Sequence, residues 1–139
     1  MDRHGSQSRL IEADLTKSVI GAFFDVYNQL DYGFLEAIYA ESLARELVRR
    51  GHRVDREVRI VVYFKGDPVG VQRVDMIVDE RLLVEIKSCH DLSKASHRQV
   101  LSYLRGSALQ VGLLLHFGPK PEFYRMVSSR PPNRVLSPP

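Results

Sequence analysis

One stretch, VDMIVDERLLVEIKS at residues 74–88, constrains the fold of this chain more than any other. It is typical of two short strands on a tight polar turn, because apolar runs flank the segment Asp79-Glu80-Arg81. The two strands nevertheless carry Asp75 and Glu85 among their hydrophobic residues. Any fold of this chain must therefore give two carboxylates a place inside a β-hairpin.

The register of this hairpin decides where the carboxylates lie. A turn centred on Glu80 places Asp75 directly opposite Glu85, with Cβ atoms about 4.5–5.5 Å apart. Side chains alternate along a strand, so Lys87 shares the face of Glu85, and Arg73 is expected to share the face of Asp75. A slip of one residue would separate the two acids. The other face is then expected to hold the apolar side chains: Val74, Met76, Val78, Val84 and Ile86.

Two carboxylates placed opposite each other repel, and the repulsion grows as water is excluded. Lys87 supplies one compensating positive charge. A divalent cation compensates more, and Mg²⁺ typically uses one or two carboxylates together with water and phosphate oxygens. The alternative is an exposed sheet face on which Arg73, Asp75, Glu85 and Lys87 form ordinary ion pairs, since short motifs often match by chance.

The rest of the chain predicts an α/β fold with a sheet flanked by helices. Helical periodicity covers residues 15–30, behind a cap at Asp14, and residues 34–50, which end at Gly51. The apolar side of the second helix is expected to be Leu35, Ile38, Tyr39, Leu43 and Leu47. The remaining elements are two strands around the turn at 65–68, a third strand at 81–89, a helix at about 93–105, a strand buried on both faces at 111–118, and an edge strand at 122–127.

Length and composition limit the number of domains and the class of protein. The 139 residues, 44% of them hydrophobic, fit one domain, which we place at residues 11–127 between polar or proline-rich tails at 1–10 and 128–139. No apolar run is long enough for a membrane span or a secretory signal, so we expect a cytoplasmic protein without membrane contact. The single cysteine excludes an internal disulfide. The net charge of +3 allows an anionic partner without requiring one.

Four segments carry a family resemblance: GFLEAIY at 33–39, VDMIVD at 74–79, VEIKS at 84–88 and QVLSY at 99–103. Together they resemble the GxxExxY proteins of the PD-(D/E)XK nuclease superfamily, over about residues 12–127. The resemblance implies a restriction-endonuclease-like αβββαβ core with a mixed central sheet. It also implies cleavage of phosphodiester bonds that depends on Mg²⁺ or Mn²⁺.

Carried over by position, the resemblance assigns roles to six residues. Asp75 and Glu85 match the metal-binding acids, and Lys87 matches the catalytic lysine. Glu36 matches a helical acid that would complete the metal site, although an acid in the first turn of a helix is also favoured by the helix dipole alone. The QxxxY pattern adds two further catalytic candidates, Gln99 and Tyr103. Val74 stands where the superfamily motif has a proline.

The expected partner is a nucleic acid, DNA more than RNA. Lys94, Arg98 and Arg105 lie on the predicted helix that also carries Gln99, which makes them the better candidates for phosphate contacts. The second helix and the strand after it are also rich in arginine, but there the arginines alternate with acids, which is typical of a solvated face. The alternatives are a catalytically idle nucleic-acid-binding or protein-interaction module, and a junction-type nuclease working as a homodimer.

Overall fold

The structure, a computed structural model, describes residues 11–128 and confirms the α/β prediction. The predicted tails lie outside the described residues, except for Ser128. In chain order the elements are α2 (Ala13–Leu30), α3 (Glu36–Arg49), β1 (Val54–Phe64), β2 (Asp67–Val78), β3 (Leu82–Ser88), α4 (Lys94–Gly106), β4 (Val111–Phe117) and β5 (Pro121–Val127).

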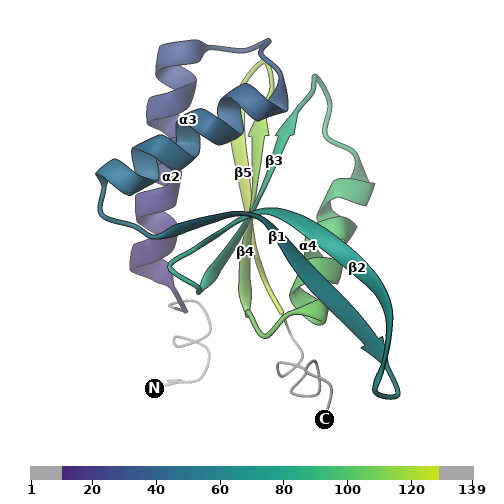
Figure 1. Cartoon of the computed structure of the whole chain (residues 1–139). Coiled ribbons are helices and arrows are strands. Elements are labelled where there is room, and N and C mark those ends of the chain that lie inside the picture. The colour runs from purple at the N-terminus through teal and green to yellow at the C-terminus, as the bar shows by residue number, and fades with distance from the viewer. Residues whose placement is uncertain (1–10, 129–139) are drawn as a thin grey trace, which may run out of the picture.

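The five strands form one mixed sheet in the order β1-β2-β3-β4-β5 (Figure 1). Only β3 and β4 are parallel, because α4 connects them as a crossover, and the other neighbours are antiparallel. All seven residues of β4 are buried, as a strand covered on both faces requires. β5 forms the edge beside it, where the sequence placed a last strand.

Helices cover both faces of the sheet, and each face has its own apolar core. On the α2–α3 face, Phe117 of β4 packs edge-on against Phe23 at 4.8 Å between ring centroids and stacks on Tyr39 at 4.0 Å. On the α4 face, Val100, Tyr103 and Leu104 pack against the sheet together with Leu83 and Leu114. The sheet therefore separates two apolar cores, and the same strands contribute side chains to both.

Two local predictions about the helices are wrong. Asp14 lies inside the first turn of α2 and does not cap it, since the cap position is Glu12. Leu35 and Ile38 are 75% and 41% exposed, although helical periodicity placed them with the buried residues of α3. Leu35 precedes the helix in an extended conformation, and α3 contacts the core through Tyr39 and the residues one and two turns beyond it.

β1 and β2 form a long hairpin that extends away from the other strands (Figure 1). Its turn is Lys65-Gly66, with φ of 51° and 85°, the backbone of a tight type I′ turn. Both strands change sides along their length, because Val74 packs in the α4-face core whereas Met76 packs in the α2–α3 core. The change falls at Asp75 and at Glu57, which has a φ of +49°.

This change of side corrects one prediction. Val74 was expected to share the face of Met76, and Arg73 that of Asp75, by simple alternation. The strongly twisted backbone at the Glu57 position breaks that alternation just before Asp75.

A chain of polar side chains ties the α2–α3 layer to the β2–β3 turn. Ser18 Oγ lies 2.7 Å from His52 Nε2, and His52 Nδ1 lies 2.7 Å from Asp79 Oδ2. The N–H of Arg53 donates to Asp79 Oδ1 at 2.8 Å. Burial raises the pKa of Asp79, but hydrogen bonds from Arg53 and His52 outweigh it and leave the pKa below its usual value. An ionised Asp79 therefore anchors the turn that sets the hairpin register.

Candidate active site

The hairpin has the register that brings the two carboxylates together. β2 and β3 are paired at three positions, Met76 with Val84, Ile77 with Leu83 and Val78 with Leu82. The next pair in this register is Asp75 and Glu85, and there side-chain hydrogen bonds replace the backbone ladder. The N–H of Asp75 donates to Glu85 Oε1 at 3.2 Å, and the N–H of Ile86 donates to Asp75 Oδ2 at 2.7 Å.

The alternation around this pair is as predicted on β3. Met76, Val84 and Ile86 belong to the core on the α2–α3 face. Glu85 points to the α4 face, as does Leu83 two residues before it. Lys87 lies on the same face, with its Nζ 3.7 Å from Glu85 Oε2.

Burial makes this carboxylate pair electrostatically unfavourable. Glu85 is 5% exposed, and burial together with the nearby Asp75 raises its pKa to about 8. Lys87 and the Asp75 N–H act in the opposite direction and do not compensate. At neutral pH the free protein therefore holds a proton on this pair for most of the time.

α4 supplies the next neighbour of the acids. Burial, Glu85 and Asp75 together raise the pKa of Tyr103 to about 12, so its hydroxyl stays protonated beside the carboxylates. Gln99 lies one helical turn earlier on the same side of α4 and is half-buried. Its side chain makes no hydrogen bond to the residues described here, 11–128.

Glu36 is placed differently from the prediction. Its Oε1 accepts the N–H of Ser88 at 3.1 Å, at the end of β3. Within residues 11–128, no three His, Cys, Asp or Glu side chains converge closely enough to hold a metal ion. The expectation that Glu36 joins Asp75 and Glu85 in one site is therefore not met in this structure, because the start of α3 lies over the end of β3 rather than over the acid pair.

Two groups of basic residues, one at α3 and one on α4, differ in their partners. Arg45, Arg49 and Arg50, at the C-terminal half of α3, form ion pairs with Glu41, Glu46 and Asp25 at 2.5–3.5 Å. Lys94, Arg98 and Arg105, here called the α4 basic stripe, are exposed and have no ion-pair partner in the part of the chain that the structure describes. Their spacing of four and seven residues aligns them along one side of α4.

His116 is a residue that the sequence analysis missed. It is 3% exposed and pairs with Lys87 across the parallel β3–β4 ladder. Its Nε2 lies 2.8 Å from the carbonyl oxygen of Cys89, which can only accept, so this nitrogen carries the hydrogen. The contact fixes the backbone just beyond Lys87. A lone polar residue within the apolar run VGLLLHFG was the signal for it.

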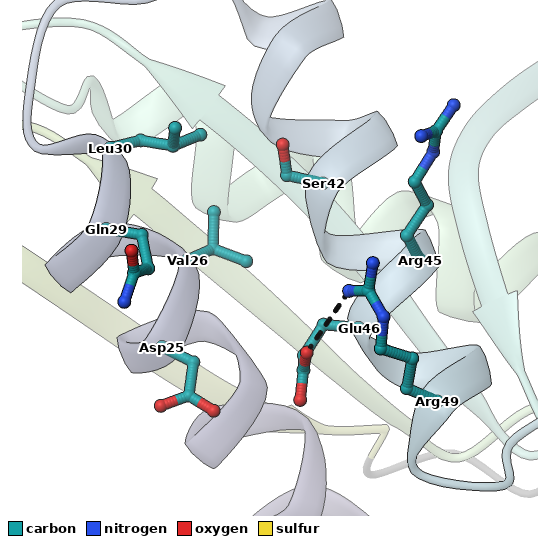
Figure 2. A pocket seen from close by; sticks show the side chains of 8 residues that line it. All are labelled: Asp25, Val26, Gln29, Leu30, Ser42, Arg45, Glu46 and Arg49. Atoms are coloured by element: carbon teal, nitrogen blue, oxygen red, sulfur yellow. Dashed lines mark ion pairs between the residues drawn. The ribbon is translucent and has the colours of Figure 1, made fainter.

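A hollow of about 500 Å³ lies between α2 and α3, away from these residues. Figure 2 shows its lining, with Arg45 and Arg49 on one side, Asp25 and Gln29 on the other, and an ion pair between Arg49 and Glu46. None of the predicted site residues contributes to it.

Comparison with known families gives one match. The family model of the PD-(D/E)XK nuclease superfamily matches residues 13–126, and the chain belongs to this superfamily. No curated protein and no solved structure matches significantly. None of the helices within residues 11–128 is both long and apolar enough to cross a membrane.

The acid pair offers the kind of oxygen donors that a small divalent cation takes. Asp75 Oδ2 and Glu85 Oε1 accept backbone hydrogen bonds, which orients both carboxylates. Each carboxylate keeps a second oxygen, and Glu85 Oε2 already has Lys87 Nζ 3.7 Å away. Hard carboxylate oxygens are the ligands that Mg²⁺ and Mn²⁺ take, with water completing the coordination.

Proposed function

We propose that the protein is a metal-dependent nuclease that hydrolyses phosphodiester bonds in DNA. The observation that carries the proposal is the Asp75–Glu85 pair, in which Glu85 is buried and Asp75 is partly buried. Their carboxylates are oriented by backbone N–H groups and share a face with Lys87. If both carboxylates were ionised with a single lysine nearby, their repulsion would cost stability, so a cation that replaces the proton suits this pair. Superfamily membership supports phosphodiester hydrolysis as the reaction class.

Asp75 and Glu85 would hold Mg²⁺ or Mn²⁺ through their second oxygens. A cation held there would supply Lewis-acid stabilisation of the phosphate and would make a bound water more acidic. Lys87 would hold the scissile phosphate as a point charge on the same face. We leave Glu36 out of the metal site, since within residues 11–128 no three acidic, histidine or cysteine side chains converge closely enough to hold a metal ion.

α4 would provide the remaining contacts. The protonated hydroxyl of Tyr103 can donate a hydrogen bond to a phosphate oxygen beside the acids, and Gln99 lies next to it on the helix. The α4 basic stripe would bind the DNA backbone, which needs unpaired positive charge and no base-specific geometry.

Incubation with single-stranded, duplex and branched DNA, in Mg²⁺, Mn²⁺ or EDTA, tests the proposal. We expect cleavage with either cation and none in EDTA, and RNA of the same sequences extends the comparison. DNA binding without cleavage under every condition would favour the idle module of the same fold. If the protein neither binds nor cleaves DNA, the proposed nuclease function is rejected.

A further inference from the structure

The segment between α2 and α3 presents apolar side chains to solvent. Tyr32, Phe34, Leu35 and Ile38 are 39%, 42%, 75% and 41% exposed, and they lie within seven consecutive residues. Clustered exposed apolar side chains of this kind mark interaction sites more often than isolated ones do.

The backbone of this segment is held firmly. The N–H of Phe34 donates to Tyr39 Oη at 3.2 Å, and its carbonyl accepts from Ser88 Oγ at 2.5 Å. Tyr39 also donates to the carbonyl of Asp31, and its ring is fully buried against Phe117. The backbone that carries the exposed ring of Phe34 is therefore held in place before any ligand arrives.

A hollow of about 490 Å³ opens beside this segment. Two aromatic residues, a carboxylate and the end of β3 line it, through Tyr32, Phe34, Glu36, Ser88 and Cys89. Glu36 Oε1 accepts the Ser88 N–H, which leaves Oε2 as an acceptor without a partner in residues 11–128. The hollow thus combines flat apolar surface with one oriented acceptor.

The hollow lies at the end of β3, where its lining begins one residue beyond Lys87. Ser88 follows Lys87 directly in β3, and Cys89 follows Ser88. Burial and the charge of Glu36 raise the pKa of Cys89, whereas the charge of Lys87 lowers it. Both charged side chains therefore lie close enough to Cys89 to act on its thiol. A nucleic-acid strand whose phosphate contacts Lys87 would bring an adjacent base to the hollow.

We propose that this hollow is a subsite for one unpaired nucleobase next to the scissile phosphate, an inference that rests on the proposed function. Aromatic rings stack on bases, which supports single-stranded substrate. Glu36 accepts hydrogen bonds from the exocyclic amino groups of cytosine or adenine and repels phosphate. In a duplex these amino groups are paired and the base faces are covered, so single strands are the preferred substrate.

Binding of 12-nucleotide single strands and 12-base-pair duplexes, measured by fluorescence anisotropy in EDTA, tests the subsite. Phe34→Ala should weaken single-strand binding by about fivefold or more, as the loss of one base-stacking contact implies. Duplex binding should stay within about twofold. Phe64→Ala is the matched control, because Phe64 is 63% exposed at the far tip of the β1–β2 hairpin. It should bind both substrates like wild type.

Glu36→Gln separates the subsite from a metal role. We expect this variant to lose the preference for cytosine and adenine over thymine homopolymers when binding is measured in EDTA, where no metal contributes. Loss of all cleavage would place Glu36 at the metal and overturn its role here. If wild type cleaves DNA but Phe34→Ala binds single strands unchanged, the subsite fails while the proposed function stands. The same holds if Phe34→Ala turns a dimer into a monomer in sedimentation, because the exposed apolar segment is then a contact between two copies of the chain. A wild type that neither binds nor cleaves DNA rejects both.

Discussion

The two faces of the sheet differ in whether their charged side chains have partners of opposite charge. On the α2–α3 face, Arg45, Arg49 and Arg50 all lie within ion-pair distance of acids. On the α4 face, the basic stripe has no acidic partner among residues 11–128, and two carboxylates share one lysine. The three arginines of the first face are paired within the protein. On the second face, positive and negative side chains remain that a ligand can pair with.

This difference separates charges that are paired within the protein from charges that remain open to a ligand. Residues 84–87 of β3 serve both faces, with Val84 and Ile86 in the apolar core and Glu85 and Lys87 in the candidate site. Substitutions at neighbouring positions should therefore have different consequences for stability and for activity.

The largest effect should come from Asp75→Asn. Removing one charged ligand should abolish cleavage and the stabilisation by Mn²⁺, which is about 2.7 kcal/mol at a hundredfold excess over Kd. Asp25→Asn is the control on the other face, since Asp25 is an exposed partner of Arg50. It should retain both properties in thermal melting with and without Mn²⁺ and in the cleavage assay. A Mn²⁺ shift that survives in Asp75→Asn would contradict the metal site.

Ile86→Ala should have the largest effect on stability. Its side chain is 1% exposed on the α2–α3 face, and such truncations cost about 2–5 kcal/mol. Asp75→Asn should leave the metal-free stability equal or higher, because repulsion with Glu85 is relieved while the amide oxygen can still accept from the Ile86 N–H. Urea unfolding in EDTA compares the two. Equal destabilisation would show that the Asp75 carboxylate is mainly structural.

Stability should depend on pH through Glu85. Its folded pKa of about 8 lies above the unfolded value, so its contribution is fully present below about pH 4.5 and is lost as pH rises through 8. Between pH 5 and 8 the metal-free unfolding free energy of wild type should therefore fall relative to that of Glu85→Gln. Parallel curves for the two proteins would mean that Glu85 ionises normally.

Mn²⁺ binding should show the reverse dependence on pH. The cation competes with the proton on the acid pair, so its affinity should rise by about tenfold per pH unit below pH 8 and level off above it. Isothermal titration calorimetry in buffers of different ionisation enthalpy measures both the affinity and the proton released. An affinity that is constant from pH 6 to 8 would exclude coupling to Glu85.

The smallest effect should distinguish the two groups of arginine. Arg98→Ala should lower the slope of log affinity against log salt by about 0.7–0.9, the value for one lost phosphate contact. Arg45→Ala should leave the slope unchanged, because Glu41 already neutralises Arg45 at 2.7 Å. Anisotropy titrations from 50 to 200 mM salt decide between them. Equal slopes for both variants would mean that DNA does not follow α4.

The sequence was sufficient for the features that depend on local periodicity. Alternation along residues 74–88, with one turn position, predicted that Asp75 and Glu85 adjoin and that Ile86 is in the core. It failed at Val74, because the positive φ of Glu57 has no sequence signature as clear as a glycine. Here the twist of a partner strand decided which face a side chain takes.

Features that depend on the placement of whole elements were beyond the sequence. Helical spacing grouped Ile38 with Tyr39 but could not show where α3 extends past the sheet. The contact of Glu36 with Ser88 joins positions 52 residues apart and follows from the angle of α3 over β3. The ion pair of Arg50 with Asp25 likewise required the packing of α3 against α2.

The acid pair also provides its own spectroscopic reporters. The N–H groups of Asp75 and Ile86 donate to carboxylate oxygens where a regular ladder would offer carbonyls. Amide proton chemical shifts respond strongly to the charge of the acceptor, so these two resonances should move when Glu85 titrates and again when a cation withdraws electron density from the carboxylates. An ¹⁵N-labelled sample would thus report protonation and occupancy of the site from two backbone amides, without substrate and without an added probe.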